Sequence, residues 1–239
     1  LIRFIPYTIT TGFTTGIAVT IFIGQIKDFM GLTFMEAPVE TMGKLGQVIS
    51  CINTLNLQAL AVGAVSLAIL ILWPGCFKKV PPSLIAVVAA AVLVKALDLK
   101  VNTIGDLYTI SSGLPTFRLP SISFSMVQRV MPDAITIAVL AAIESLLSCV
   151  VADGMIGGKH NSNMELVAQG VGNAASALFG GIPATGAIAR TAANIKNGGR
   201  SPVAGMVHAA VLLLILVFLM PYAALIPMPA IAAILFMVA

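Results

Sequence analysis

The sequence predicts an all-α polytopic membrane protein. Hydrophobic residues make up 59% of the chain and charged residues only 9%, whereas roughly a quarter of the residues of soluble domains are charged. The mean hydropathy is +1.04. Apolar runs near the ~20 residues needed to cross a bilayer recur along the chain, with polar breaks between them. These runs are continuous rather than alternating, which favours helices over a β-barrel.

The first part of the chain predicts three membrane spans, at about Pro6–Met30, Leu55–Trp73 and, shorter, Ser83–Leu97. Pro6 suits the first turn of a helix because its missing N–H would be unpaired there anyway. A polar connection, Thr33–Asn53, separates the first two spans. A long loop, Asp98–Arg129, follows the third, and we expect only short ordered pieces within it.

The second part predicts a span at about Asp133–Ala152, a shorter apolar stretch at Met164–Phe179, a strongly apolar span at Ser201–Met220 and the start of another at Pro227–Ala239. The chain opens on Leu1 without an initiator Met and stops inside an apolar run. We therefore expect residues 1–239 to be a partial transmembrane domain.

The stretch between two of these spans, residues 180–202, is too interrupted to cross a bilayer as one helix. Gly180, Gly181 and Pro183 prevent a continuous helix, whereas Ala187–Ile195 can form a short one that ends at Asn197–Gly199. A half-helix that starts inside a membrane points unpaired N–H groups and the positive end of its dipole at the protein interior. This arrangement predicts an anion-binding pocket.

Small residues open this half-helix. Thr185, Gly186 and Ala187 would let a ligand approach the backbone closely. Arg190 lies one turn further on, where it would attract an anion or pair with a carboxylate such as Glu144. A structural ion pair, or a charge extended toward the membrane surface, is the alternative for Arg190.

Glu144 is the one acidic residue deep inside an apolar run. It lies eleven residues after Asp133, or ~16 Å along a helix, near the midplane of a ~30 Å core. A charge there costs about 2.5–3.5 kcal/mol and usually faces a cavity, a partner or an ion path. Ala141 and Ser148 share its face and are small or polar, which leaves room beside it for a ligand or another backbone. Glu144 is thus expected to titrate or bind a cation, or else only to hydrogen-bond a neighbouring helix.

Other classes of function lack the residues that they need. His160 and His208 have no partner at metal-ligand spacing, so no metal or cofactor is expected. GMIGGKH departs from the phosphate-binding loop pattern at Asp153 and His160, and no GxSxG nucleophile motif is present. The charges of the long loop mix in sign, so no nucleic-acid partner is expected. An enzyme is therefore not predicted.

Three long blocks of sequence resemble the SulP anion permeases, relatives of the animal sulfate and chloride exchangers and of prestin. They are IPYTITTGFTTGIAVTIFIGQIKDFMGL, AIESLLSCVVADGMIGGKHNSNMELVAQGVGN and LFGGIPATGAIARTAANIKNGGRSPVAGMVHA. The resemblance implies a uracil-permease-like fold of fourteen segments in two inverted repeats, usually followed by a STAS domain. By this match the chain covers segments five to twelve, and the first four, the last two and STAS are absent.

The resemblance also implies roles for residues that match the family pattern. The anion would lie at the start of the tenth-segment helix, here Gly186, Ala187, Ile188 and Ala189, with Thr185 before them and Arg190 behind. The eighth-segment carboxylate is Glu144, with Ser148 one turn on. Sodium-coupled bicarbonate members are expected to hold Asp and Thr where this chain has Glu144 and Ile188, which favours coupling to protons.

The expected function is secondary active transport of a small anion, sulfate or a C4-dicarboxylate, by proton symport and alternating access. The alternatives are a sodium-coupled bicarbonate transporter and a non-transporting membrane sensor on the same scaffold. The lipid bilayer is the expected environment, as a multi-pass protein of the bacterial inner membrane, and a homodimer is the expected assembly.

Overall fold

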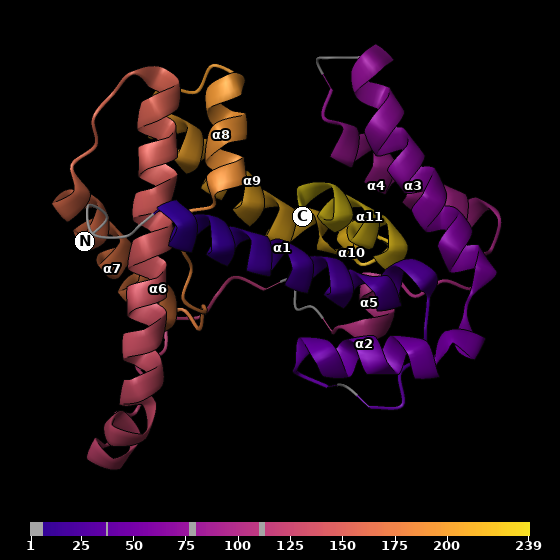
Figure 1. Cartoon of the computed structure of the whole chain (residues 1–239), viewed down its shortest axis with the longest axis horizontal. Helices are drawn as coiled ribbons and strands as arrows, with labels where there is room; N and C mark the ends of the chain where they lie inside the picture. The colour runs from indigo at the N-terminus through magenta and orange to yellow at the C-terminus, as the bar shows by residue number, and fades with distance from the viewer. Residues whose placement is uncertain (1–6, 37, 77–79, 110–112) are drawn as a thin grey trace. The chain divides into compact units, whose positions relative to one another are not determined.

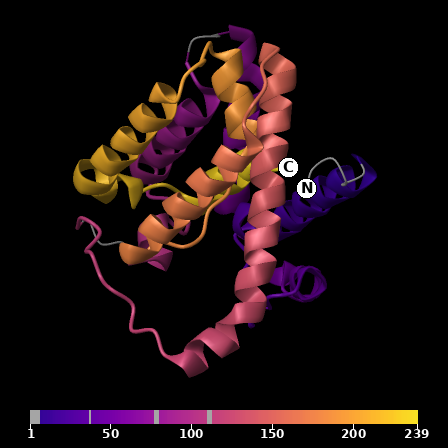
Figure 2. The same cartoon turned by 90° about the vertical axis from the view of Figure 1, so that its left-hand side faces the viewer.

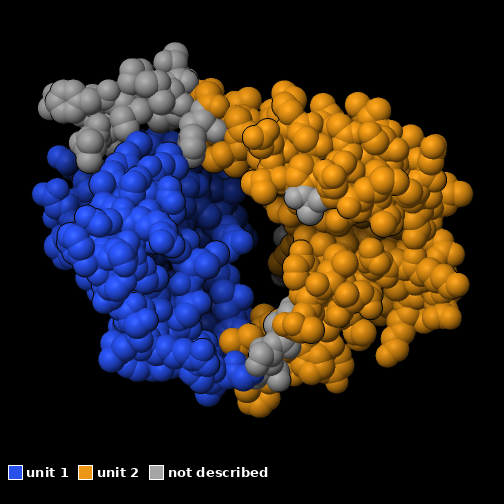
Figure 3. All heavy atoms as spheres, turned by 90° about the horizontal axis from the view of Figure 1, so that it is seen from below, with its two compact units in different colours: residues 1–6, 113–214 blue, residues 7–112, 215–239 orange. Residues whose placement is uncertain are grey.

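The computed structural model describes residues 7–36, 38–76, 80–109 and 113–239, and within these ranges the regular elements are helices, with no strand. The expected all-α class is confirmed. Pro6, the expected start of the first span, lies outside the described residues. The described chain forms two compact units (Figure 3): unit 1 holds residues 113–214, and unit 2 holds residues 7–112 and 215–239.

Unit 2 is built around three packed helices. α3 lies against both α4 and α11, and α11 also packs on α1 (Figure 1). The elements of unit 2 are α1 (Tyr7–Met30), α2 (Thr41–Ser50), η2 (Ile52–Thr54), α3 (Leu57–Cys76), α4 (Pro82–Ala96), α5 (Ile104–Leu107), η3 (Ile215–Leu219), α10 (Met220–Ala223) and α11 (Met228–Val238).

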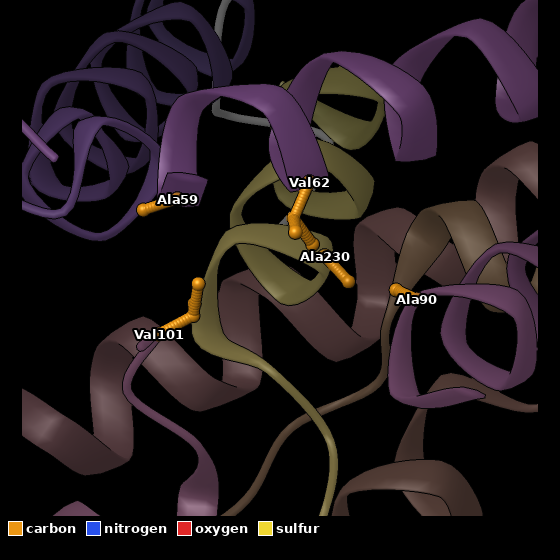
Figure 4. Packing of buried hydrophobic residues seen from close by; sticks show 5 residues of the cluster. All are labelled: Ala59, Val62, Ala90, Val101 and Ala230. Atoms are coloured by element: carbon orange, nitrogen blue, oxygen red, sulfur yellow. The ribbon is translucent and has the colours of Figure 1, made fainter. Parts of the chain in front are cut away.

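Small side chains form the core of unit 2. Ala59, Val62, Ala90, Val101 and Ala230 are buried together where α3, α4 and α11 meet (Figure 4). Helices with small residues at their contact can approach closely, which is how helices associate when lipid supplies no hydrophobic driving force between them. The core of this unit is therefore typical of a membrane protein.

Backbone hydrogen bonds to the chain at the start of α5 hold the residues that lead into α11. Ile104 donates its N–H to the carbonyl of Ile226 over 3.0 Å, and Met228 donates to the carbonyl of Asn102 over 2.9 Å. Extended backbone that is removed from water needs such partners, because an unpaired polar group is costly there. Asn102, just before α5, and Ile104, its first residue, supply them.

Unit 1 contains α6 (Phe124–Ile156), α7 (Ser162–Leu178), α8 (Ile188–Lys196) and α9 (Val203–Leu214). The 33-residue α6 packs against both α7 and α8 (Figure 2). Side chains cap both long helices at their starts: Ser123 accepts the N–H of Met126, and Asn161 accepts the N–H of Met164. The broken stretch predicted from the sequence lies in this unit, between the end of α7 and α8.

Each predicted span corresponds to one or more helices. Among the described residues, Leu57–Gly75, Phe124–Ile156 and Val203–Ala223 are long and apolar enough to cross a membrane, and α4 and α11 are shorter apolar helices.

Two helical regions differ from the prediction. The expected connection Thr33–Asn53 contains α2, whose apolar residues recur at helical spacing among polar ones. The expected loop before Asp133 is shorter, because α6 starts at Phe124 and continues through Pro132. The Ser123 cap and the apolar residues after it favour helix strongly enough to accommodate the proline.

Candidate functional site

The broken stretch in unit 1 begins with a sharp stop of α7. Gly180 adopts φ 75°, and Gly181 donates its N–H to the carbonyl of Ser176 over 2.9 Å, which closes the helix with a left-handed turn. A Cβ on Gly181 would collide with the Ser176 hydroxyl and lie 3.0 Å from the Ser176 carbonyl oxygen. Both positions therefore favour glycine, and the helix stops before them, as the sequence predicts.

Residues 181–187 then run without helix until α8 begins at Ile188, with Ala187 as its N-cap in the extended region. No side chain caps this end, and the first turn carries no acidic residue. The first backbone hydrogen bond of α8 runs from the N–H of Thr191 to the carbonyl of Ala187 over 3.0 Å. The N–H groups of residues 187–190 precede it and have no partner within the helix. The predicted half-helix with free donors is present.

Hydroxyl groups attach the start of this half-helix to α6. Ser145, only 1% exposed, accepts the N–H of Gly186 over 3.1 Å, and its oxygen lies 2.9 Å from that of Thr185. Thr185 donates to the carbonyl of Ala141 over 3.1 Å. Because the Thr185 proton is used there, Ser145 is the donor in the bond between the two hydroxyls.

The Gly186 contacts refine the expected anion site. Its N–H is already taken by Ser145, and a Cβ there would lie 3.4 Å from Ser145 Cα and 3.5 Å from Ser148 Cβ. Gly186 therefore faces α6, and a Cβ there would make only ordinary contacts with that helix. The donors left for a ligand are those of residues 187–190.

Ser148 links α6 to α8 one turn further along. It is 4% exposed and donates to the hydroxyl of Thr191 over 2.9 Å. The sequence predicts that Ala141 and Ser148 leave room beside Glu144 for a ligand or another backbone. The structure places the backbone and side chains of the half-helix there.

α7 holds the same stretch from another side. The Asn173 amide donates to the carbonyl of Ala184 over 2.9 Å and accepts the Ala184 N–H over 2.9 Å. Gln169 donates to the same carbonyl. Both side chains line an open surface groove, whose lining consists of Glu165, Ala168, Gln169, Gly172, Asn173, Ser176, Ala184 and Thr185.

Glu144 and Arg190 are not joined by an ion pair in the described part of the chain. Glu144 is half-buried, and Arg190 is exposed. Glu144 lies eleven residues after Asp133 and nine before Asp153, so that ~16 Å and ~14 Å of helix separate it from the charges on either side. Its carboxylate has no hydrogen-bond partner among the described residues, so neither the inert hydrogen bond nor the ion pair considered from the sequence is formed there.

Hydrogen bonds of His160 hold the loop between α6 and α7. Its Nδ1 lies 2.7 Å from Asp153 Oδ2, its Nε2 lies 2.8 Å from the Ser162 hydroxyl, and its N–H donates to the same aspartate over 3.0 Å. These bonds join the end of α6 to the start of α7.

The described residues contain no group of three or more acidic, His or Cys side chains arranged to hold a metal.

Four contact residues do not stand out in the sequence as parts of the site: Ser145, Gln169, Asn173 and Thr191. Their signals are weak, since a serine beside Glu144 and two amides four residues apart on α7 are ordinary in any helix. Only packing brings them into contact with partners that lie 11 to 43 residues away along the chain.

Comparison with known proteins identifies the family. The sequence profile of the Sulfate permease family matches residues 1–239. The chain is 43% identical over 241 residues to the putative sulfate transporter YvdB of Bacillus subtilis, covering 100% of this chain and 46% of that protein. It is 35% identical over 240 residues to the bicarbonate transporter BicA of Synechocystis sp., covering 99% of this chain and 42% of that protein. The chain thus spans less than half the length of these curated relatives.

Two solved structures share the fold. The transmembrane domain of a cyanobacterial bicarbonate transporter BicA matches with a TM-score of 0.83 and 34% identity, over 99% of this chain and 60% of that one. SLC26A9 matches with a TM-score of 0.83 over 98% of this chain and 38% of that one, and at 21% identity it supports the fold alone. The predicted polytopic transporter fold is confirmed, and the matched proteins are transporters rather than enzymes. Because the family profile matches the chain from end to end, this protein belongs to the sulfate permease family.

Proposed function

We propose that the protein containing this chain is a secondary active transporter of a small anion. The observation that carries the proposal is the start of α8, where the N–H groups of residues 187–190 have neither a capping side chain nor an acidic neighbour in the first turn. An uncapped helix N-terminus attracts negative charge through these donors and the helix dipole. The names of the relatives, transporters of sulfate and of bicarbonate, support the same class of ligand.

The binding residues of the proposal are Ala187, Ile188, Ala189 and Arg190. The first three supply backbone donors from positions with small or apolar side chains, and Arg190 adds positive potential from the same turn. Thr185 and Gly186 act differently, because their hydrogen bonds to α6 fix the place of those donors. The proposed substrate is sulfate or a C4-dicarboxylate.

Glu144 is the proposed coupling group. It lies between the charged ends of α6, beside the two serines that hold the half-helix, and no basic side chain neutralises it within the described residues. Uptake of a proton by Glu144 would remove a negative charge near the anion, so the two ligands would favour each other's binding. Alternating access, with this chain as segments five to twelve of a homodimeric inner-membrane protein, completes the proposal.

Sodium-coupled bicarbonate transport is the second candidate, favoured by the identity to BicA. The two candidates differ in what drives uptake. We would reconstitute the full-length protein in liposomes and measure uptake of labelled sulfate, fumarate and bicarbonate under an imposed pH or sodium gradient. Accumulation of sulfate or fumarate on a pH gradient is expected. Uptake driven by sodium and indifferent to the pH gradient would exclude proton coupling and favour the second candidate.

A further inference from the structure

Ala184 is the point at which the non-helical stretch before α8 is attached to α7. Asn173 pairs with both of its backbone groups, at 2.9 Å each, and Gln169 adds a second donor to its carbonyl. An amide side chain can donate to a carbonyl and accept from an N–H of the same residue at once. The Asn173 side chain therefore pairs with both backbone groups of Ala184, as the backbone of a neighbouring strand would in a β-sheet.

The place of Ala184 determines where the half-helix starts. Ala187, the N-cap of α8, follows it three positions later, and no helical hydrogen bond spans this stretch. On the other side, Thr185 and Gly186 are bonded to α6. Without Asn173, Gln169 would still hold the carbonyl, but the N–H of Ala184 would lose its acceptor, and an unpaired backbone N–H favours a shift of the chain toward another partner.

We propose that Asn173 is a positioning residue for anion binding: its amide fixes Ala184 and thereby the depth at which the donors of residues 187–190 are presented. The inference rests on the proposed function, because it assigns those donors to an anion. Asn173 itself has no role as a ligand in this proposal. Its effect is on affinity, since the donors bind well only from the correct place.

Replacement of Asn173 by aspartate gives a specific test, because the two protonation states of a carboxyl group differ in the bonds that they can form. A protonated carboxyl both donates and accepts, as the amide does, and can restore both bonds to Ala184. An ionised carboxylate only accepts, and it would place a negative charge against the Ala184 carbonyl oxygen. Asn173→Asp should therefore be defective when ionised and restored when protonated, whereas Asn173→Ala cannot be restored at any pH.

The measurement is exchange of labelled sulfate by the full-length protein in liposomes, with equal pH on both sides from about pH 8 to about pH 3, which brackets the ordinary aspartate pKa of ~3.9. Exchange of labelled bicarbonate is measured at the high end of this range alone, and each rate is expressed relative to wild type. Asn173→Ala should raise the half-saturating concentration about tenfold at every pH, with little change in the maximal rate. The half-saturating concentration of Asn173→Asp should match that of Asn173→Ala at high pH and approach the wild-type value at low pH. Asn163→Asp, the same change at an exposed position of α7, should behave as wild type throughout.

A pH-independent defect of Asn173→Asp, or no defect, would overturn the inference. Hydrogen exchange of the amides of residues 182–188 supplies a readout that needs no transport. Exchange should be faster in Asn173→Ala, and in Asn173→Asp only at high pH, while equal protection in all variants would also overturn the inference. If wild type exchanges neither anion, the proposed function fails for these substrates, and hydrogen exchange still decides whether Asn173 fixes the stretch.

Discussion

At the scale of single residues, the candidate site separates groups that hold the half-helix from groups that are left free. Ser145, Ser148 and Asn173 use their polar atoms on the half-helix and the stretch before it. Glu144, in the midst of these residues, uses none of its atoms on any described partner. A half-buried carboxylate without a partner costs free energy, which supports the coupling role proposed for Glu144.

Glu144→Gln tests this account. The amide keeps the size of the side chain and removes its charge and its titration. We expect the variant to lose proton-driven accumulation, so that internal anion reaches only the level found without a gradient, while exchange of anion across the membrane continues. The measurement is uptake by liposomes with and without a pH gradient, beside exchange at equal pH. A variant that still concentrates anion on a proton gradient would show that Glu144 has no part in coupling.

Gly181→Ala tests the stop of α7. A Cβ there overlaps the Ser176 side chain, and overpacking of this kind costs typically about 1–3 kcal/mol of stability. We expect a lower thermal unfolding midpoint in detergent. Gly186→Ala is the matched control in the same stretch, because its Cβ would make only ordinary contacts at 3.4 and 3.5 Å. Removal of the hydroxyl in Gly181→Ala/Ser176→Ala should recover part of the loss, and equal midpoints for all three variants would contradict the steric argument.

At the scale of elements, hydrogen bonds from side chains stabilise the ends of short helices. α5 has only four residues, and its start is bonded to Asp106, whose carboxylate accepts the Thr103 N–H over 2.8 Å and the Thr103 hydroxyl over 2.7 Å. First the backbone bond and then the hydroxyl bond hold the pKa of Asp106 below its usual value. The carboxylate is exposed, so the stabilisation is small.

The sign of this pKa shift sets a pH prediction for α5. A carboxyl group whose pKa is lowered by folding adds stability above its unfolded pKa, ~3.9 for aspartate, and loses it as the pH falls through the folded value. Wild type should therefore unfold at a higher temperature than Asp106→Ala near neutral pH, by the equivalent of at most about 1 kcal/mol. The difference should shrink as the pH is lowered below about 4. Thermal unfolding of both proteins across this range is the measurement, and a constant difference would contradict it.

At the scale of the whole molecule, the sequence predicts elements better than it predicts their partners. Spans such as α3 and the helices after residue 200 are recognised because a bilayer selects long apolar runs. The half-helix is recognised because glycines and a proline interrupt one of these runs. α2 and the first turns of α6 are missed, since amphipathic and polar-capped helices resemble connections when they are judged by hydropathy alone. Contacts such as that of Asn173 with Ala184 depend on packing, which no local pattern encodes.

The hydroxyl chain between the half-helix and α6 limits how a proton could act on the anion. The chain runs from the Gly186 N–H through Ser145 and Thr185 to the Ala141 carbonyl. An amide N–H can only donate and a carbonyl can only accept, so both ends lock the direction of every O–H in between. A proton wire must reverse its hydroxyls after each passage, and this chain cannot. A proton held by Glu144 would therefore influence the anion through its electric field, without travelling along these hydroxyls.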